Sequence, residues 1–174
     1  MGKNQLITTK STSLILAKSR NLMDLTKSLL LAKKQDLENN NEVVIIGNLM
    51  WQKETIGRMK WEDAMEYAKN LKLGGYDDWR LPTVDELGDI VILCGGVLVS
   101  WDEKGWREKV DKNNDNAQYQ ASYREKGFLP NFCWTSSTYA NRRQFAWVVY
   151  FGSGYDSGYY KSNTYHLRCV RSKY

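Results

Sequence analysis

Apolar residues recur at helical spacing near the start of the chain. Between residues 13 and 34 they lie seven, three and four positions apart, which predicts an amphipathic helix of heptad type whose apolar row is interrupted by Lys18. The row consists of Ile15, Leu22, Leu25, Leu29 and Ala32. Ser11, Thr12 and Ser13 are suitable N-caps. Such a helix either packs on its own domain or serves in oligomerisation or attachment, and the pattern leaves both open.

A polar, asparagine-rich stretch at residues 36–41 separates this helix from the rest of the chain. We therefore expect an N-terminal helical extension, residues 1–40, followed by one globular domain, residues 41–174. The domain opens with an apolar run that predicts a strand from Val43 toward Trp51.

Two helices are predicted next. Apolar residues return at helical spacing over 61–71, and Gly74–Gly75 follows as a stop signal. Thr83 and Glu86 then form a capping box, in which each side chain satisfies the other residue's backbone N–H. This predicts a second helix that continues through Leu93.

The rest of the chain changes from polar to β-like. Residues 101–127 show little periodicity and predict a long loop, or an insertion with short elements. From Phe132 onward apolar residues alternate, and a last strand is expected over 165–171. The fold class is therefore α+β, with two helices and a small mixed sheet in which the N- and C-terminal strands pair.

The aromatic residues suggest where the core lies. Trp79, Trp134 and Trp147 are expected in the core, while Asp78 and Arg80 are expected to fix the loop before the second helix. One late strand is predicted to bury Phe145, Trp147, Val149 and Phe151.

Charge and hydropathy exclude several classes of protein. The net charge is +5, but residues 1–40 supply a surplus of four and the remaining 134 residues a surplus of only one. The domain thus lacks the clustered cations of a nucleic-acid footprint, and no nucleic-acid partner is expected. No apolar run reaches the ~18 residues of a membrane span. The first residues do not resemble a signal peptide, and the sequence leaves the localisation open.

Candidate metal ligands are sparse. Cys94, Cys133 and Cys169 are widely spaced and are expected to be buried free thiols, so neither a zinc site nor any other cofactor is expected. Asp111, Asn113, Asn114 and Asp115 offer some oxygen ligands for calcium, although a solvated polar loop is the favoured interpretation.

Several uncommon short sequence motifs in residues 44–171 carry a family resemblance. They are Trp61-Glu62-x-Ala64, Gly74-Gly75-Tyr76-x-Asp78-Trp79-Arg80-Leu81-Pro82-Thr83-x-x-Glu86-Leu87, Trp134-x-Ser136-Ser137-Thr138, Ala146-Trp147-x-Val149-x-Phe151-x-x-Gly154 and Arg168-Cys169-Val170-Arg171. In these the chain resembles the DUF1566 family, whose members occur in bacterial surface and adhesin-like proteins. The resemblance implies a C-type-lectin-like fold of the formylglycine-generating-enzyme type. Lys60 departs from the family's usual Thr before the first Trp, and residues 1–40 have no counterpart.

The chain also resembles the variable proteins of diversity-generating retroelements, of an archaeal or archaeal-virus type. There a mutagenic reverse transcriptase randomises adenines in a C-terminal repeat, and the lectin-like scaffold tolerates the changes. Residues 139–165 contain six Tyr, three Ser, three Gly, two Asn and an Arg pair, which is the composition of an antibody paratope. Gln144, Trp147 and Lys161 cannot arise from randomised Asn codons and are expected to be fixed. The candidate variable, ligand-binding residues are Tyr139, Asn141, Arg142, Arg143, Tyr150, Tyr155, Asp156, Ser157, Tyr159, Tyr160, Ser162, Asn163 and Thr164.

Together these features favour a non-enzymatic binding protein. His166 is the only histidine, and a Cys133–His166 or Cys169–His166 pair is the remaining route to a nucleophile. The partner is expected to be an unknown protein or cell-surface ligand. A glycan bound with fixed specificity, as DUF1566 adhesins imply, is the alternative.

Overall fold

The computed structural model describes the backbone of residues 3–39, 42–100 and 103–173, with side chains from residue 14 onward except those at 35 and 37–41. Contacts divide the chain into two compact units, Met1–Asn40 and Asn41–Tyr174, and each is described by itself.

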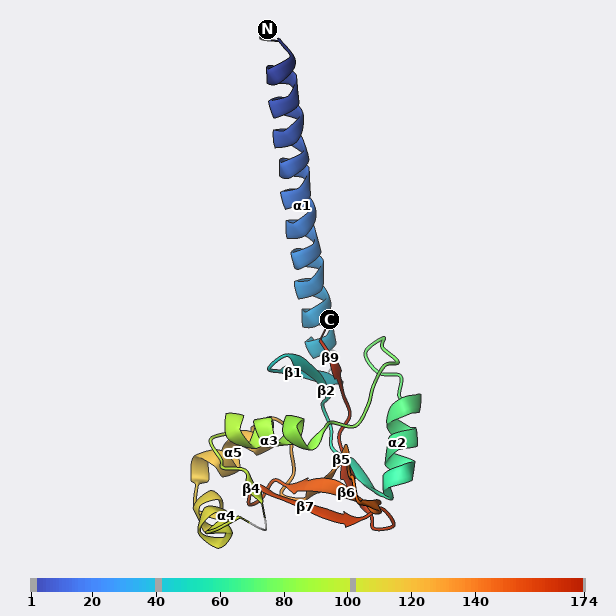
Figure 1. Ribbon diagram of the computed structural model, residues 1–174, viewed down its shortest axis with the longest axis vertical. Helices are drawn as coiled ribbons and strands as arrows, with labels where there is room; N and C mark the ends of the chain where they lie inside the picture. Colours follow the sequence, from blue (N-terminus) through green and yellow to red (C-terminus); the bar gives the residue numbers. More distant parts are fainter. Residues whose placement is uncertain (1–2, 40–41, 101–102, 174) are drawn as a thin grey trace. The chain divides into compact units, whose positions relative to one another are not determined.

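The first unit is one helix, α1 (Lys3–Asn39), of 37 residues (Figure 1). It is longer than the predicted 13–34, and the expected N-caps at 11–13 lie inside it. All side chains from 14 to 33 are exposed. Within the ranges that the structure describes, no helix is both long and apolar enough to cross a membrane.

The second unit contains a three-stranded sheet of order β1-β2-β9. The expected single strand from Val43 to Trp51 is instead a hairpin of β1 (Val43–Ile46) and β2 (Leu49–Gln52). Gly47, with a φ of 62°, provides the turn between them. The last strand, β9 (Val170–Ser172), pairs antiparallel with β2 and not with β1. The two ends of the domain therefore meet as predicted, but through the second arm of the hairpin.

The larger sheet has six strands in the order β3-β8-β5-β6-β7-β4. It is mixed, because β4 runs parallel to β7 and β5 runs parallel to β8, while the other pairs are antiparallel. The strands are β3 (Ile56–Met59), β4 (Val99–Ser100), β5 (Phe132–Tyr139), β6 (Arg142–Tyr150), β7 (Tyr155–Tyr160) and β8 (Tyr165–Leu167).

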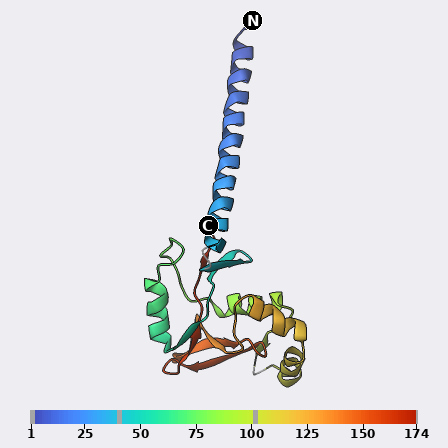
Figure 2. The same cartoon turned by 180° about the vertical axis from the view of Figure 1, so that it is seen from behind.

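Four helices belong to this unit, and α2 lies on the opposite side of it from α4 and α5 (Figure 2). They are α2 (Trp61–Asn70), α3 (Val84–Leu93), α4 (Trp106–Asn114) and α5 (Ala117–Glu125). The α+β class is confirmed, whereas the two helices expected in the domain are too few, since the described residues form four there. The stretch 101–127 supplies the two that were missed. Its helix α5 buries Tyr119 and Tyr123, four positions apart on one face.

The core lies between the helices and the inner face of the sheets. Phe128 stacks on Phe151 with ring centroids 4.4 Å apart and meets the edge of Trp51 at 5.5 Å. Helix α3 adds Leu87 and Val91, both fully buried. Burying such side chains contributes roughly 1.5–3 kcal/mol each.

Arg168 places a cation inside this core, with a relative exposure of 0%. Its Nε donates to the Gln52 carbonyl at 2.5 Å and its Nη1 to the Lys126 carbonyl at 2.6 Å. The guanidinium lies 4.1 Å from the centroid of the Phe128 ring. Burial lowers the pKa of Arg168 to about 10, so the group stays charged at neutral pH. A Cβ at Gly127 would lie 3.3 Å from the guanidinium nitrogens, which leaves little room for any other residue.

Two ion pairs fix the loop before α3. The Asp78 carboxylate accepts from Arg171 Nε at 2.6 Å and Nη2 at 3.1 Å, and this bond lowers the pKa of Asp78. Arg171 also lies 3.7 Å from the centroid of the Tyr76 ring. Arg80 makes a bidentate pair with Glu86 at 2.7 and 2.6 Å. Asp78 and Arg80 thus hold the loop as expected, each through a different partner.

The expected core positions of the tryptophans are partly correct. Trp79 is buried and donates to the Leu73 carbonyl at 3.1 Å, and Trp134 is buried and donates to Met59 at 2.9 Å. Trp147 is only half-buried, so the prediction of a core position is wrong for it.

The predicted capping box is present and is reinforced by the ion pair. Glu86 accepts from the Thr83 backbone N–H at 2.8 Å while the Thr83 hydroxyl accepts from the Glu86 N–H at 3.1 Å. Burial alone would raise the pKa of Glu86, but the hydrogen bonds from Arg80 and Thr83 outweigh it and lower the pKa.

Replacing Glu86 by Ala is expected to lower the free energy of unfolding by about 1–2 kcal/mol, because the cap and its arginine partner are lost together. The measurement is urea denaturation of the full chain. Asp85→Ala is the matched control in the same turn. Asp85 is exposed, so its loss should cost less than about 0.5 kcal/mol. Equal losses in the two variants would contradict this role of Glu86.

Candidate ligand-binding surface

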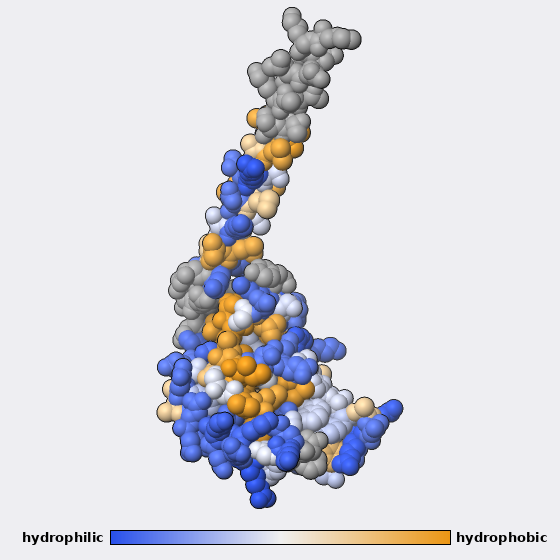
Figure 3. Space-filling model, turned by 60° about the vertical axis from the view of Figure 1, so that its left-hand side comes forward, coloured by the Kyte–Doolittle hydropathy of each residue, from blue (hydrophilic) through white to orange (hydrophobic). Residues whose placement is uncertain are grey.

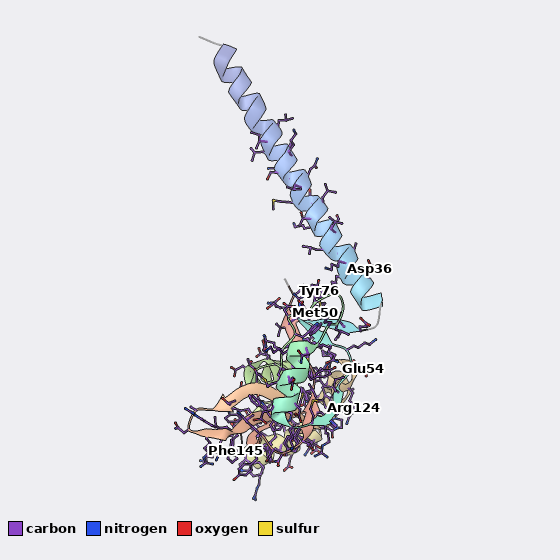
Figure 4. All side chains as sticks on the ribbon, turned by 90° about the vertical axis from the view of Figure 1, so that its right-hand side faces the viewer. Asp36, Met50, Glu54, Tyr76, Arg124 and Phe145 are labelled. Atoms are coloured by element: carbon purple, nitrogen blue, oxygen red, sulfur yellow. The ribbon has the colours of Figure 1, made fainter. Side chains whose placement is uncertain are left out.

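Two turns meet at one end of the larger sheet. One joins β5 to β6 at residues 140–141, and the other joins β7 to β8 at residues 161–164. They are neighbours because Phe145 pairs with Tyr160 across β6 and β7, and Lys161 N–H donates to the Gln144 carbonyl at 2.9 Å. We call residues 139–147 and 158–164 the tip. Figure 4 shows Phe145 at the end of the domain opposite to Met50 and Tyr76.

The tip gathers eight of the thirteen predicted binding residues. Six of them, all but Tyr139 and Tyr160, are exposed polar or arginine side chains on the two turns and the first residues of β6. The eight are Tyr139, Asn141, Arg142, Arg143, Tyr160, Ser162, Asn163 and Thr164.

Aromatic rings line a groove on one face of the tip. Tyr139 stacks on Trp147 at 4.4 Å with an interplanar angle of 9°, and Phe145 packs on Tyr160 at 4.3 Å. A groove of about 540 Å³ lies between Tyr139, Trp147, the β5–β6 turn and β7. Gly158 leaves space for the Tyr139 ring that borders the groove, because a Cβ at this position would overlap the ring.

This arrangement corrects the predicted burial of β6. Val149 and Phe151, both of the predicted set, are buried in the core as expected, whereas Phe145 and Trp147 are only half-buried. Ala146 and Val148, on the opposite face of β6, are fully buried. The alternation of apolar residues did not reveal that this end of β6 extends beyond the core. Phe145 and Trp147 are therefore surface residues that sequence reasoning assigned to the interior.

Cationic groups lie on the tip and next to it. Arg142 lies 5.8 Å from the Phe145 ring centroid, and Arg143 is exposed beside it. Lys161 lies 3.8 Å from the Trp61 ring centroid. Arg58, on β3, donates to the Thr164 carbonyl at 3.0 and 2.8 Å. Neither segment of the tip contains an Asp or Glu, so its own charge is positive.

Three of the other predicted residues, Tyr150, Tyr155 and Tyr159, lie away from this groove, whereas Ser157 borders it. The three tyrosines occupy the opposite face of β6 and β7, as the pairing of Tyr150 with Tyr155 and of Tyr159 with Ala146 requires. Tyr159 packs on Phe132 at 5.3 Å and on Tyr165 at 5.4 Å, and burial raises its pKa. The candidates therefore do not form one continuous face.

Asp156 was predicted to be an exposed binding residue, but it is buried in the domain. It is 6% exposed, and its carboxylate accepts from the Ser100 hydroxyl at 2.9 Å. The surface position expected for it is not observed. The contact with β4, two residues long, gave no recognisable sequence signal.

The structure offers no support for calcium at residues 111–115. Asn113 is buried, with its Oδ1 accepting from Val97 N–H at 2.8 Å and its Nδ2 donating to the Val97 and Ser153 carbonyls. Its amide therefore serves the fold. Within the described part of the chain, no group of three or more His, Cys, Asp or Glu residues is placed to hold a metal.

The cysteine–histidine pairings considered from the sequence lack an activated thiol. Cys133 pairs with His166 across β5 and β8, but burial raises the pKa of the Cys133 thiol to about 12. Cys169 is raised to about 12 by the same cause. Burial lowers the pKa of His166, and the nearby charge of Arg58 lowers it further. A thiol is a poor nucleophile until it ionises, so these groups are not prepared for attack at neutral pH.

A protein-family model described as the Lcl C-terminal domain matches residues 46–171. The chain belongs to the Lcl C-terminal domain family. The resemblance to DUF1566 agrees with this membership at the family level. The Lcl C-terminal domain match includes the whole tip and excludes α1. A search of curated proteins returns no match to the sequence.

The three thiols of the folded protein are expected to resist Ellman's reagent at pH 8, because all three are buried. Unfolding in guanidinium should release all three. The measurement is the absorbance change with time in the native and the denatured protein. Rapid native reaction of one thiol would contradict this and would restore a cysteine-based activity as a hypothesis.

Proposed function

We propose that this protein is a non-enzymatic ligand-binding module whose tip contacts the ligand. The observation that supports this best is the groove of stacked rings beside exposed arginines. Tyr160, 53% exposed, is among the most exposed large aromatic side chains of the domain. Rigid aromatic rings provide contact area at a low cost in conformational entropy, and Tyr and Arg often dominate binding energy at interfaces.

The tip is suited to changes of side chain without loss of the fold. Its two turns are joined through backbone groups, such as Lys161 N–H to the Gln144 carbonyl, which any residue supplies. Its exposed side chains lie outside the core around Phe151 and α3. We infer that the protein is the variable protein of a diversity-generating retroelement, built on a C-type-lectin-like scaffold. The eight candidates at the tip are then the positions that vary.

A second candidate function is fixed binding of an acidic glycan. It is favoured by the positive charge of the tip, because Arg142 and Arg143 can make charge-assisted hydrogen bonds beside rings that stack on sugars. Both functions use the same surface. They differ in whether the sequence of the tip is constant among close relatives.

The double substitution Arg142→Ala/Tyr160→Ala is expected to weaken ligand binding at least about tenfold, since it removes a cation and a ring that both contact Phe145. The measurement is biolayer interferometry with dextran sulfate, with neutral dextran of the same length as the probe control. Arg107→Ala, an exposed arginine on α4, is the matched protein control and should leave binding unchanged.

Binding of dextran sulfate that depends on the tip supports the glycan candidate. If Arg107→Ala and the double substitution weaken binding equally, the interaction is general charge attraction and does not depend on the tip. Absence of binding to either dextran removes the glycan candidate and leaves a protein ligand.

The retroelement proposal makes a separate prediction about the gene. The neighbouring DNA should contain a near-copy of the segment that encodes the tip, differing mainly at adenines, beside a reverse transcriptase gene. Sequencing the flanking region is the test. A locus without such a copy would remove the variable-protein proposal and favour fixed specificity.

A further inference from the structure

Helix α1 exposes an unusual amount of apolar surface. Nine large apolar side chains between residues 14 and 31 are 50–70% exposed, and Figure 3 shows apolar and charged patches along its visible side. At roughly 100 Å² for each, they present on the order of 900 Å². The nine are distributed around the helix, and the four that share one face, Ile15, Leu22, Leu25 and Leu29, present roughly 400 Å², about half of the ~800 Å² that each partner buries in a stable complex. The nine are Leu14, Ile15, Leu16, Leu22, Met23, Leu25, Leu29, Leu30 and Leu31.

The helix has little to stabilise it alone. In proteins most of the stability of a helix comes from packing of its apolar face rather than from intrinsic propensity. The first turn of α1 has no acidic residue and the last turn no basic residue, so neither end has favourable charges for the helix dipole. A helix of 37 residues with these ends requires a packing partner.

The spacing of the apolar row indicates which partner fits. Ile15, Leu22 and Leu29 lie exactly one heptad apart, and Leu25 and Ala32 fill the alternate positions of the same seam. A strict seven-residue repeat matches the 3.5-residue period of a coiled coil, whereas an ideal straight helix on a flat surface has a period of 3.6. The seam is therefore complementary to itself.

Charge supports the same partner. Arg20, Lys27 and Lys34 are also spaced by seven and, at ~100° per residue, lie roughly 180° from the seam. They would remain in water when two seams meet. Lys18 lies in the seam itself, where a single polar residue is tolerated in a coiled coil at a cost in stability. In a lipid surface the same lysine would interrupt the buried face.

We propose that α1 is a self-association helix, which binds α1 of a second copy of this chain in parallel through the seam of Ile15, Leu22, Leu25, Leu29 and Ala32. This goes beyond the proposed function, and its test requires no ligand.

Sedimentation velocity of the full chain between about 1 and 100 µM should show reversible association that increases with concentration. Leu29→Ala should weaken it at least about tenfold. Leu31→Ala is the matched control: the same residue type two positions away, 66% exposed against 70%, but off the seam. It should change association less than about twofold. Lys18→Leu should strengthen association about tenfold, because it completes the apolar row.

Orientation has its own test. In a parallel pair Ile15 faces Ile15, so Ile15→Cys should form an intermolecular disulfide under mild oxidation. The native thiols are buried and should not interfere. Leu31→Cys is the matched control and should cross-link slowly.

A full chain that is monomeric at every concentration overturns the proposal. Equal effects of Leu29→Ala and Leu31→Ala overturn it too, as does efficient cross-linking only at Leu31. Phosphatidylserine vesicles probe the rival partner. Binding to them by a chain that is monomeric in solution, lost in Leu29→Ala, would assign α1 to a lipid surface.

Discussion

The fold of the domain depends on how it accommodates one buried cation. Arg168 leaves the chain between β8 and β9 and reaches across the core to two backbone carbonyls, one at the end of β2 and one after α5. No carboxylate is hydrogen-bonded to it in the described structure, so carbonyl dipoles and the Phe128 ring stabilise its charge, together with the nearby charge of Glu54. These contacts join the N-terminal hairpin, the insertion and the C-terminal strands at one point. A shorter side chain would leave the two carbonyls without their donor, at a cost of about 1–3 kcal/mol for each.

The contacts of Arg168 belong to the part of the domain that stabilises the fold, and this part is distinct from the tip. The three-stranded sheet, the loop held by Asp78–Arg171 and the Phe128–Phe151 stack all lie away from the two turns at the end of β6. The rings of the tip lie at one end of the larger sheet, and α3 and α5 pack against its other end. A surface arranged in this way can exchange exposed side chains while the core residues remain the same. The half-buried rings, Tyr139 and Trp147, are the exceptions, because they pack on each other as well as facing the groove.

Sequence reasoning succeeded where a local signal was strong. The capping box at Thr83 and Glu86, helix α2 and the α+β class follow from spacing and turn chemistry alone. It failed where tertiary contacts decide. The apolar run from Phe145 to Val149 does not show where along β6 the core ends, and α4 and α5 lack the apolar periodicity by which helices are recognised. Asp156 is buried because β4 passes beside it, and a two-residue strand leaves no pattern. Eight of the thirteen site residues meet because two turns, which are not adjacent in sequence, end on neighbouring strands.

Gly158 has a consequence for how this surface can evolve. It sits on β7 beneath the ring of Tyr139, which belongs to β5, and any side chain there would displace that ring from Trp147. Whether position 158 on β7 tolerates a substitution therefore depends on the residue at position 139 on β5. This dependence is structural epistasis. A lineage that loses the aromatic ring at position 139 frees position 158 to mutate. A lineage that keeps the ring must retain glycine at 158, however rapidly the neighbouring positions change.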